Sequence, residues 1–166
     1  MDFLKGIPKI ITEPSAILII SAHWEEPQAT ITSGNQPNII YDYSGFPPEA
    51  YEIQYPASGN SELAQEIGSL IRRDEIEVKL DEKRGFDHGM YVPLKLKYPK
   101  AQISCLQLSL LKSLEPSEHI TLGKSLASLR YKNVLIIGSG FSFHNLNFFS
   151  GLRRKPTKIV SRSING

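Results

Sequence analysis

Two nearly continuous apolar runs constrain the fold of this chain most strongly. They are "AILIIS" at residues 16–21 and "NVLIIGS" at residues 133–139. Strands covered on both faces contain unbroken apolar runs, whereas half-exposed strands alternate apolar and polar residues. The two runs therefore predict central strands of a mostly parallel sheet that has helices on both faces.

Three further segments predict additional strands. "EIEVKL" at residues 75–80 alternates apolar and charged residues, so one face is solvated and the strand should lie nearer a sheet edge. "QISCLQLSL" at 102–110 places leucines on one face, and the short stretch "ATITS" at 29–33 adds another strand.

Two helix starts separate these strands. Asn60 or Ser61 can cap a helix with one apolar stripe, and Ser117 opens a second helix; the stripe comprises Leu63, Ile67, Leu70 and Ile71. Strands that alternate with helices predict a single α/β domain with right-handed crossovers. We place this domain at residues 1–150.

Composition indicates an ordinary globular protein. The 166 residues suit one domain, and no apolar run approaches the roughly 20 residues of a membrane-spanning helix. The start of the chain does not resemble a signal peptide, so we expect a soluble, cytoplasmic protein. The single cysteine, Cys105, lies in an apolar stretch and is interpreted as a buried structural thiol.

Charge is distributed unevenly. Five basic residues and no acidic residue follow Leu152, so residues 151–166 form a basic tail that we expect to be disordered. The remaining chain is mildly acidic, which argues against a nucleic-acid-binding surface over the domain. No membrane partner is expected either.

Three of the four histidines occupy positions where sites are commonly built. His23 follows the first apolar run, His144 follows the last one, and His88 lies in "GFDHG" between two glycines. Ligands bind beyond the carboxyl ends of parallel strands, so these imidazoles can share a cleft as metal ligands or as acid/base groups. His119 lies in a polar helix start and is expected to be solvated.

The sequence "GSG" at residues 138–140 lies at the end of the last apolar run. It resembles the opening of a dinucleotide-binding fingerprint, but Phe143 replaces the third small residue and no acidic partner follows at the expected distance. A nucleotide cofactor is therefore not expected. The glycines instead make the turn that precedes His144.

Four longer motifs carry a family resemblance. They are "AILIISAHWE", "YDYSGFPPEAYEIQYPASGNSELAQEI", "KRGFDHGMYVPLKLKYPKAQISCLQLSL" and "NVLIIGSGFSFHNL". In this order they resemble the class III extradiol ring-cleavage dioxygenases, and the nearest branch is the 4,5-DOPA extradiol dioxygenases. The resemblance implies cleavage of a catechol ring by insertion of O2, with Fe(2+) or Zn(2+) as cofactor.

The resemblance also implies residue roles. His23 matches a metal ligand, and His144 matches a pocket histidine that serves as acid/base or as an additional ligand. His88 matches a catalytic pocket histidine that contacts substrate, and we add Tyr43 and Phe46 as expected substrate-binding residues. The expected partners are a small catechol and O2, with a homo-oligomer as one further expectation.

The chain departs from the family pattern at both ends. The family has an "HG(S/T)P" histidine before the first motif and a longer segment after the last one, so we expect this chain to represent part of the family domain. On that basis the usual set of three ligands would not form from this chain alone.

Two other functions stay open at this level. One is a non-catalytic remnant that acts as a binding or interaction module through its aromatic loop. The other is a metal-assisted hydrolase or another small-molecule enzyme on the same scaffold. If neighbouring segments of the family domain are missing, the strand at 16–21 loses partners, and its unpaired edge would favour aggregation or dimerisation of the isolated chain.

Overall fold

The computed structural model of the chain describes residue 6 and residues 11–140. The predicted tail at 151–166 and His144 lie outside these residues. Within them the elements follow this order: β1 (Ala16–Glu26), β2 (Ala29–Thr32), η2 (Pro48–Glu52), α2 (Ser61–Arg73), β3 (Val78–Asp81), α3 (His88–Lys97), β4 (Ser104–Leu111), α4 (Pro116–Ser125), η3 (Ala127–Lys132) and β5 (Val134–Ser139).

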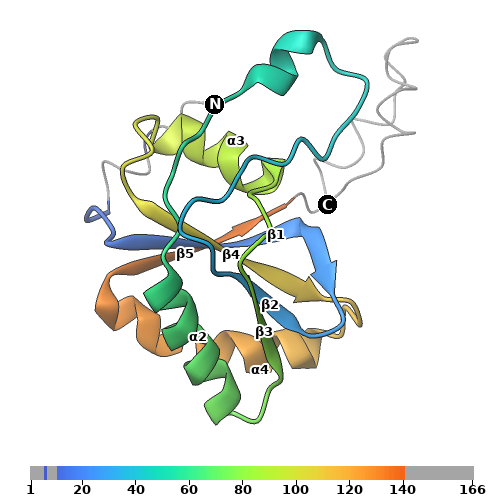
Figure 1. Cartoon of the computed structure of the whole chain (residues 1–166). Helices are drawn as coiled ribbons and strands as arrows, with labels where there is room; N and C mark the ends of the chain where they lie inside the picture. Colours follow the sequence, from blue (N-terminus) through green and yellow to red (C-terminus); the bar gives the residue numbers. More distant parts are fainter. Residues whose placement is uncertain (1–5, 7–10, 141–166) are drawn as a thin grey trace, which may run out of the picture.

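The strands form one five-stranded sheet in the order β3-β2-β4-β1-β5. The β1–β4, β1–β5 and β2–β3 pairs are parallel, and only β2 and β4 pair antiparallel. Helix α3 covers one face of the sheet, whereas α2 and α4 cover the other (Figure 1). The predicted mostly parallel α/β fold is therefore confirmed.

Strand β1 is buried on both faces, as its composition predicts. Ile17 and Ile19 pack into the apolar cluster beneath α3, while Ala16 and Leu18 pack into the cluster beneath α2 and α4. Alternate side chains of a strand point to opposite faces, so a continuous apolar run fills both layers. This strand is the centre of the core from which the site is built.

The start of α2 is also confirmed. The Asn60 side chain accepts a hydrogen bond from the Leu63 backbone N–H at 2.9 Å, which satisfies one of the free donors of the first turn. Helix α4 begins at Pro116, one residue before the predicted Ser117, and its N-cap residue makes no side-chain capping bond.

The position of β5 differs from the prediction. Its sequence predicts a central strand, but β5 lies at one edge of the five described strands and is only partly buried. An apolar run indicates that a strand's side chains favour burial. It does not indicate how many strands pair with it, because that depends on the tertiary structure. By contrast, β3 lies at the opposite edge, as its alternation predicts.

None of the described helices combines the length and the apolar character that crossing a membrane requires.

Candidate active site

His23 lies in an irregular part of β1. Pairing with β4 runs regularly from Ala16 to Ile20 and then shifts before resuming at Glu25. Extra residues in one strand bend it and re-aim its side chains, and such bulges are common beside active sites. His23 therefore lies between the two paired stretches of β1, outside the regular ladder with β4, and its side chain is exposed.

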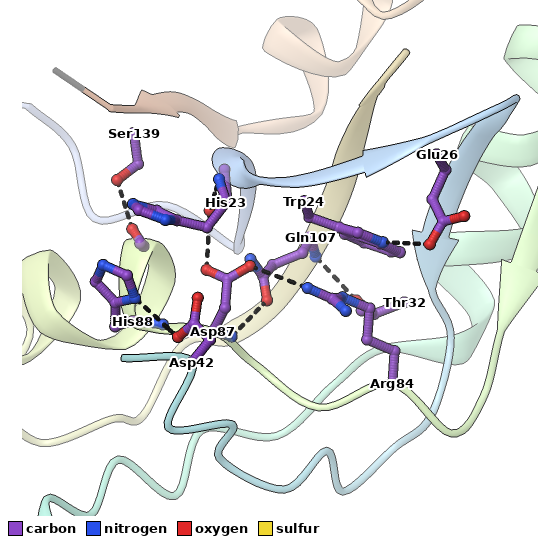
Figure 2. A network of polar contacts seen from close by, with 12 residues as sticks. His23, Trp24, Glu26, Thr32, Asp42, Arg84, Asp87, His88, Gln107 and Ser139 are labelled. Atoms are coloured by element: carbon purple, nitrogen blue, oxygen red, sulfur yellow. Dashed lines mark hydrogen bonds and ion pairs between the residues drawn. The ribbon is translucent and has the colours of Figure 1, made fainter. Parts of the chain in front are cut away.

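His88 is the first residue of α3, and its ring contacts the His23 ring where the start of α3 comes close to β1. The two imidazole ring centroids lie 3.9 Å apart, with the rings tilted by 50° (Figure 2). A Cβ on Gly89 would lie 2.4 Å from Ser21 Oγ and 3.2 Å from His23 Cδ2. Only glycine at this position lets the start of α3 come so near to β1.

Asp42 joins the two histidines from the irregular segment after β2. Phe86 N–H donates to Asn38 O at 2.7 Å, and Ile40 N–H donates to Phe86 O at 2.8 Å, so this segment runs beside the residues that precede α3. Asp42 Oδ1 then accepts the His88 backbone N–H at 3.0 Å and faces His88 Nδ1 at 2.7 Å.

The contact between Asp42 and His88 favours the ionised form of Asp42 and sets the tautomer of His88. Burial acts to raise the pKa of Asp42, but hydrogen bonds and charge attraction from His88 outweigh it, so the pKa lies below its usual value. An ionised carboxylate can only accept hydrogen bonds, so His88 donates through Nδ1–H. In the neutral ring Nε2 is then the acceptor.

His23, Asp42 and His88 form a cluster with potential metal ligands. One donor atom of each side chain lies within 4.8 Å of the others. Two imidazoles and one carboxylate form a donor set that suits non-haem iron with open coordination positions. Asp42 supplies a third group that sequence reasoning missed. The available signal was an acidic residue between two tyrosines in an aromatic segment.

An apolar pocket adjoins this cluster. It has a volume of about 290 Å³, and its lining is Tyr43, Phe46, Ala50, Ile53, His88 and Val92. Tyr43 meets the His88 ring edge-on at a centroid distance of 5.4 Å and accepts a hydrogen bond from Tyr91 OH at 3.1 Å. Burial, followed by this hydrogen bond, raises the pKa of Tyr91, so its hydroxyl stays protonated as the donor.

Two other predictions concern residues away from the cluster. His119 is partly buried, not fully solvated: Nε2 accepts the Leu111 N–H at 3.0 Å, and Nδ1–H donates to Glu115 O at 2.9 Å. It fastens the start of α4 to the end of β4. Cys105 is fully buried, as predicted, and burial raises its pKa to about 12.

Comparison with known proteins places this architecture in a family. A family model described as the catalytic LigB subunit of aromatic ring-opening dioxygenase matches residues 2–155. The chain is 43% identical over 155 residues to the dioxygenase tasH of Hapsidospora irregularis, covering 89% of this chain and 48% of that protein. It is 45% identical over 136 residues to the 4,5-DOPA dioxygenase extradiol of Beta vulgaris, covering 81% and 51%.

A solved structure agrees with these matches. The crystal structure of an uncharacterized protein from Escherichia coli K12 is similar with a TM-score of 0.72 and 32% sequence identity, covering 87% of this chain and 54% of that one. The chain thus spans about half the length of these relatives. On its sequence and its fold, the chain belongs to the family of the LigB catalytic subunit of aromatic ring-opening dioxygenases.

Proposed function

We propose that this chain carries the site of an extradiol dioxygenase that opens the ring of a catechol such as DOPA. The observation that carries the proposal is the convergence of His23, Asp42 and His88 from three distant segments onto one point. Family membership supports it, since relatives are named as DOPA dioxygenases.

The donor set fits the divalent metal that this chemistry needs. We assign His23 as a ligand, and we assign His144, which lies outside the described residues, as a further ligand or acid/base group. Asp42 and His88 place a carboxylate and a second imidazole within reach of the same ion. When bound, Fe(II) or Zn(II) supplies Lewis acidity toward the catechol oxygens, and iron also supplies redox activity toward O2.

His88 is suited to move a proton. With Nδ1–H directed at Asp42, the Nε2 of His88 either binds the ion or accepts a proton from a catechol hydroxyl, and in the second role the adjacent carboxylate stabilises the charged ring that results. The bond to Asp42 also fixes the orientation of the imidazole before substrate arrives.

The apolar pocket is suited to hold the substrate ring. Tyr43 and Phe46 lie at a centroid distance of 5.3 Å, and Phe46 is 60% exposed, so its ring is available to a ligand. Aromatic side chains pack edge-on or offset against another aromatic ring. A catechol placed here would lie against His88, which also lines the pocket.

The test is an anaerobic loading of the full chain with Fe(II), followed by addition of DOPA and O2. Cleavage beside the two hydroxyls inserts both oxygen atoms and yields an aldehyde and a carboxylic acid, which give a yellow product. Yellow product and O2 uptake in equal amounts support the proposal.

Two outcomes would overturn it. Binding of DOPA without O2 uptake would assign the chain to the binding modules. Hydrolysis of an ester or amide by the metal-loaded chain, without ring cleavage, would assign it to the hydrolases. A sample loaded with zinc serves as the control for reactions that need no redox change.

A further inference from the structure

A buried carboxylate lies directly beneath the histidine pair. Asp87 is 0% exposed, and its Oδ1 accepts the Ser21 hydroxyl at 2.8 Å. Its Oδ2 accepts Arg84 Nη2 at 3.3 Å. A buried charge is tolerated only when it is paired and hydrogen-bonded, and these two contacts provide that compensation.

The Asp87 carboxylate does not cap α3, although its position in the sequence predicts a cap. Asp87 is the N-cap residue of α3, a place where aspartate commonly accepts a hydrogen bond from the first turn of the helix, yet its side chain makes no capping bond. It turns instead toward β1 and Arg84 (Figure 2). A capping aspartate that gives up its cap indicates that the carboxylate serves another contact.

Ser21 connects this carboxylate to His23. The Ser21 hydroxyl donates to Asp87, and its oxygen accepts the His23 backbone N–H at 3.2 Å. This bond lies in the segment of β1 where pairing with β4 is interrupted. Because regular pairing with β4 is lost there, the serine hydroxyl fixes the backbone of His23 from the side.

Asp87 also fixes the backbone next to His88, the second histidine of the pair. Asp87 directly precedes His88, and its N–H donates to Gln107 Oε1 on β4 at 3.1 Å. Its carbonyl accepts the Met90 N–H at 3.0 Å and so begins the helix. Asp87 therefore anchors His88 through its main chain and His23 through its side chain.

Arg84 completes the network by balancing the buried charge. Its guanidinium carbon lies 4.2 Å from the centroid of the Trp24 ring, in a cation–π contact. Trp24 is buried, and its Nε1–H donates to Glu26 Oε1 at 2.8 Å. The Trp24 ring thus packs against the Arg84 guanidinium, the cation that pairs with Asp87.

We propose that Asp87 is a positioning residue that, through Ser21, holds His23 at the spacing from His88 that metal binding requires. The inference rests on the proposed function for its metal ion. The contacts among Asp87, Ser21 and His23 are observed without that ion. Groups that orient metal ligands affect metal affinity without touching the ion.

Two measurements on the full chain test the proposal. The first is the Kd for Zn2+ by competition titration. The second is the imidazole proton spectrum of the metal-free chain, in which the adjacent His23 and His88 rings shift each other's resonances. The variants are Ser21→Ala, Asp87→Ala and Asp87→Asn.

A matched control is available in β4. Ser109 is also fully buried, and its hydroxyl oxygen accepts the Thr30 backbone N–H at 3.1 Å. Ser109→Ala therefore removes the same kind of bond from a buried serine outside the histidine site. It should keep the wild-type Kd and imidazole shifts.

Ser21→Ala and Asp87→Ala should weaken Zn2+ binding by about 10- to 100-fold. Asp87→Asn should recover part of the loss, because its amide oxygen can still accept the Ser21 hydroxyl. Wild-type affinity together with unchanged imidazole shifts in folded Ser21→Ala overturns the inference, even if Asp87→Ala does not fold. If the wild-type chain binds no zinc but Ser21→Ala still moves the imidazole shifts, positioning stands and the metal assignment fails.

Discussion

The imidazoles of His23 and His88 lie at a centroid distance of 3.9 Å with their rings tilted by 50°, one from the irregular part of β1 and the other from the start of α3. Gly89 makes this approach feasible, and Asp42 binds the second ring through Nδ1. Together the three side chains place two nitrogen donors and one carboxylate near the ends of the parallel strands.

Replacing His23 should remove metal binding. His23→Ala deletes a proposed ligand, so its affinity for Fe(II) or Zn(II) should fall by more than about 100-fold, since even the groups that orient ligands contribute 10- to 100-fold. Elemental analysis after loading and gel filtration measures the result. His119→Ala is the matched control, because His119 bonds to β4 and α4 outside the cluster. Equal metal content in both variants would refute the assignment of His23.

Shortening Phe46 should weaken substrate binding more than turnover. Phe46→Ala removes an exposed ring from the pocket beside His88 but leaves the histidines in place. We expect KM for a catechol to rise by about 5- to 30-fold, which corresponds to roughly 1–2 kcal/mol of lost aromatic contact, with kcat little changed. Steady-state kinetics separates the two constants. Leu114→Ala, another exposed apolar residue, is the control, and an equal rise in its KM would argue against the pocket.

A methyl group at position 89 should disturb both stability and the site. Gly89→Ala places a Cβ 2.4 Å from Ser21 Oγ, so either the Ser21 hydroxyl must leave Asp87 or β1 and α3 must separate. The free energy of unfolding should fall by about 1–3 kcal/mol. Gly123→Ala in α4 meets no atom within 4 Å and should be neutral or stabilising by up to about 1 kcal/mol. Urea denaturation of the two variants provides the comparison, and equal stability would contradict the close approach.

Acid should destabilise the protein partly through Asp81. Burial acts to raise the pKa of Asp81, but the N–H groups of Arg84 and Lys83, with nearby positive charge, outweigh it, and the pKa lies below its ordinary value. A lowered folded-state pKa contributes stability above the unfolded value of about 3.9, and this is lost as the pH falls through the folded value.

Asp81→Asn should therefore lose less unfolding free energy than the wild type between about pH 5 and about pH 3. Denaturant titrations at both pH values measure the difference. Asp74→Asn, which removes an exposed carboxylate 3.7 Å from Arg73, is the control and should behave like the wild type. A wild-type acid response in Asp81→Asn would show that these hydrogen bonds do not stabilise the fold.

Cys105 should be inert in the folded protein. The thiolate is the reactive form, and a pKa of about 12 leaves about one thiol in ten thousand ionised at pH 8. Labelling with iodoacetamide should be very slow in buffer and rapid in concentrated urea, as followed by mass spectrometry. Rapid labelling of the native protein would place Cys105 nearer the surface than its complete burial implies.

Local sequence patterns determined much of the scaffold. The unbroken run in β1 predicts burial on both faces, and the Asn60 cap predicts the start of α2, because each depends on a few neighbouring residues and on backbone geometry. The family motifs likewise drew attention to His23 and His88. Their roles and that of His144 remain proposals.

Tertiary structure decided how these parts meet. Nothing in its own apolar run places β5 at an edge, and nothing around Asp42 in the sequence reveals its bonds to His88. The link from Asp87 through Ser21 to His23 also joins residues far apart in the chain. The sequence by itself determined the strands, the start of α2 and the candidate imidazoles. The packing of α3 against β1 decided the spacing of the imidazoles, because long-range contacts arise only when the folded backbone brings distant residues together.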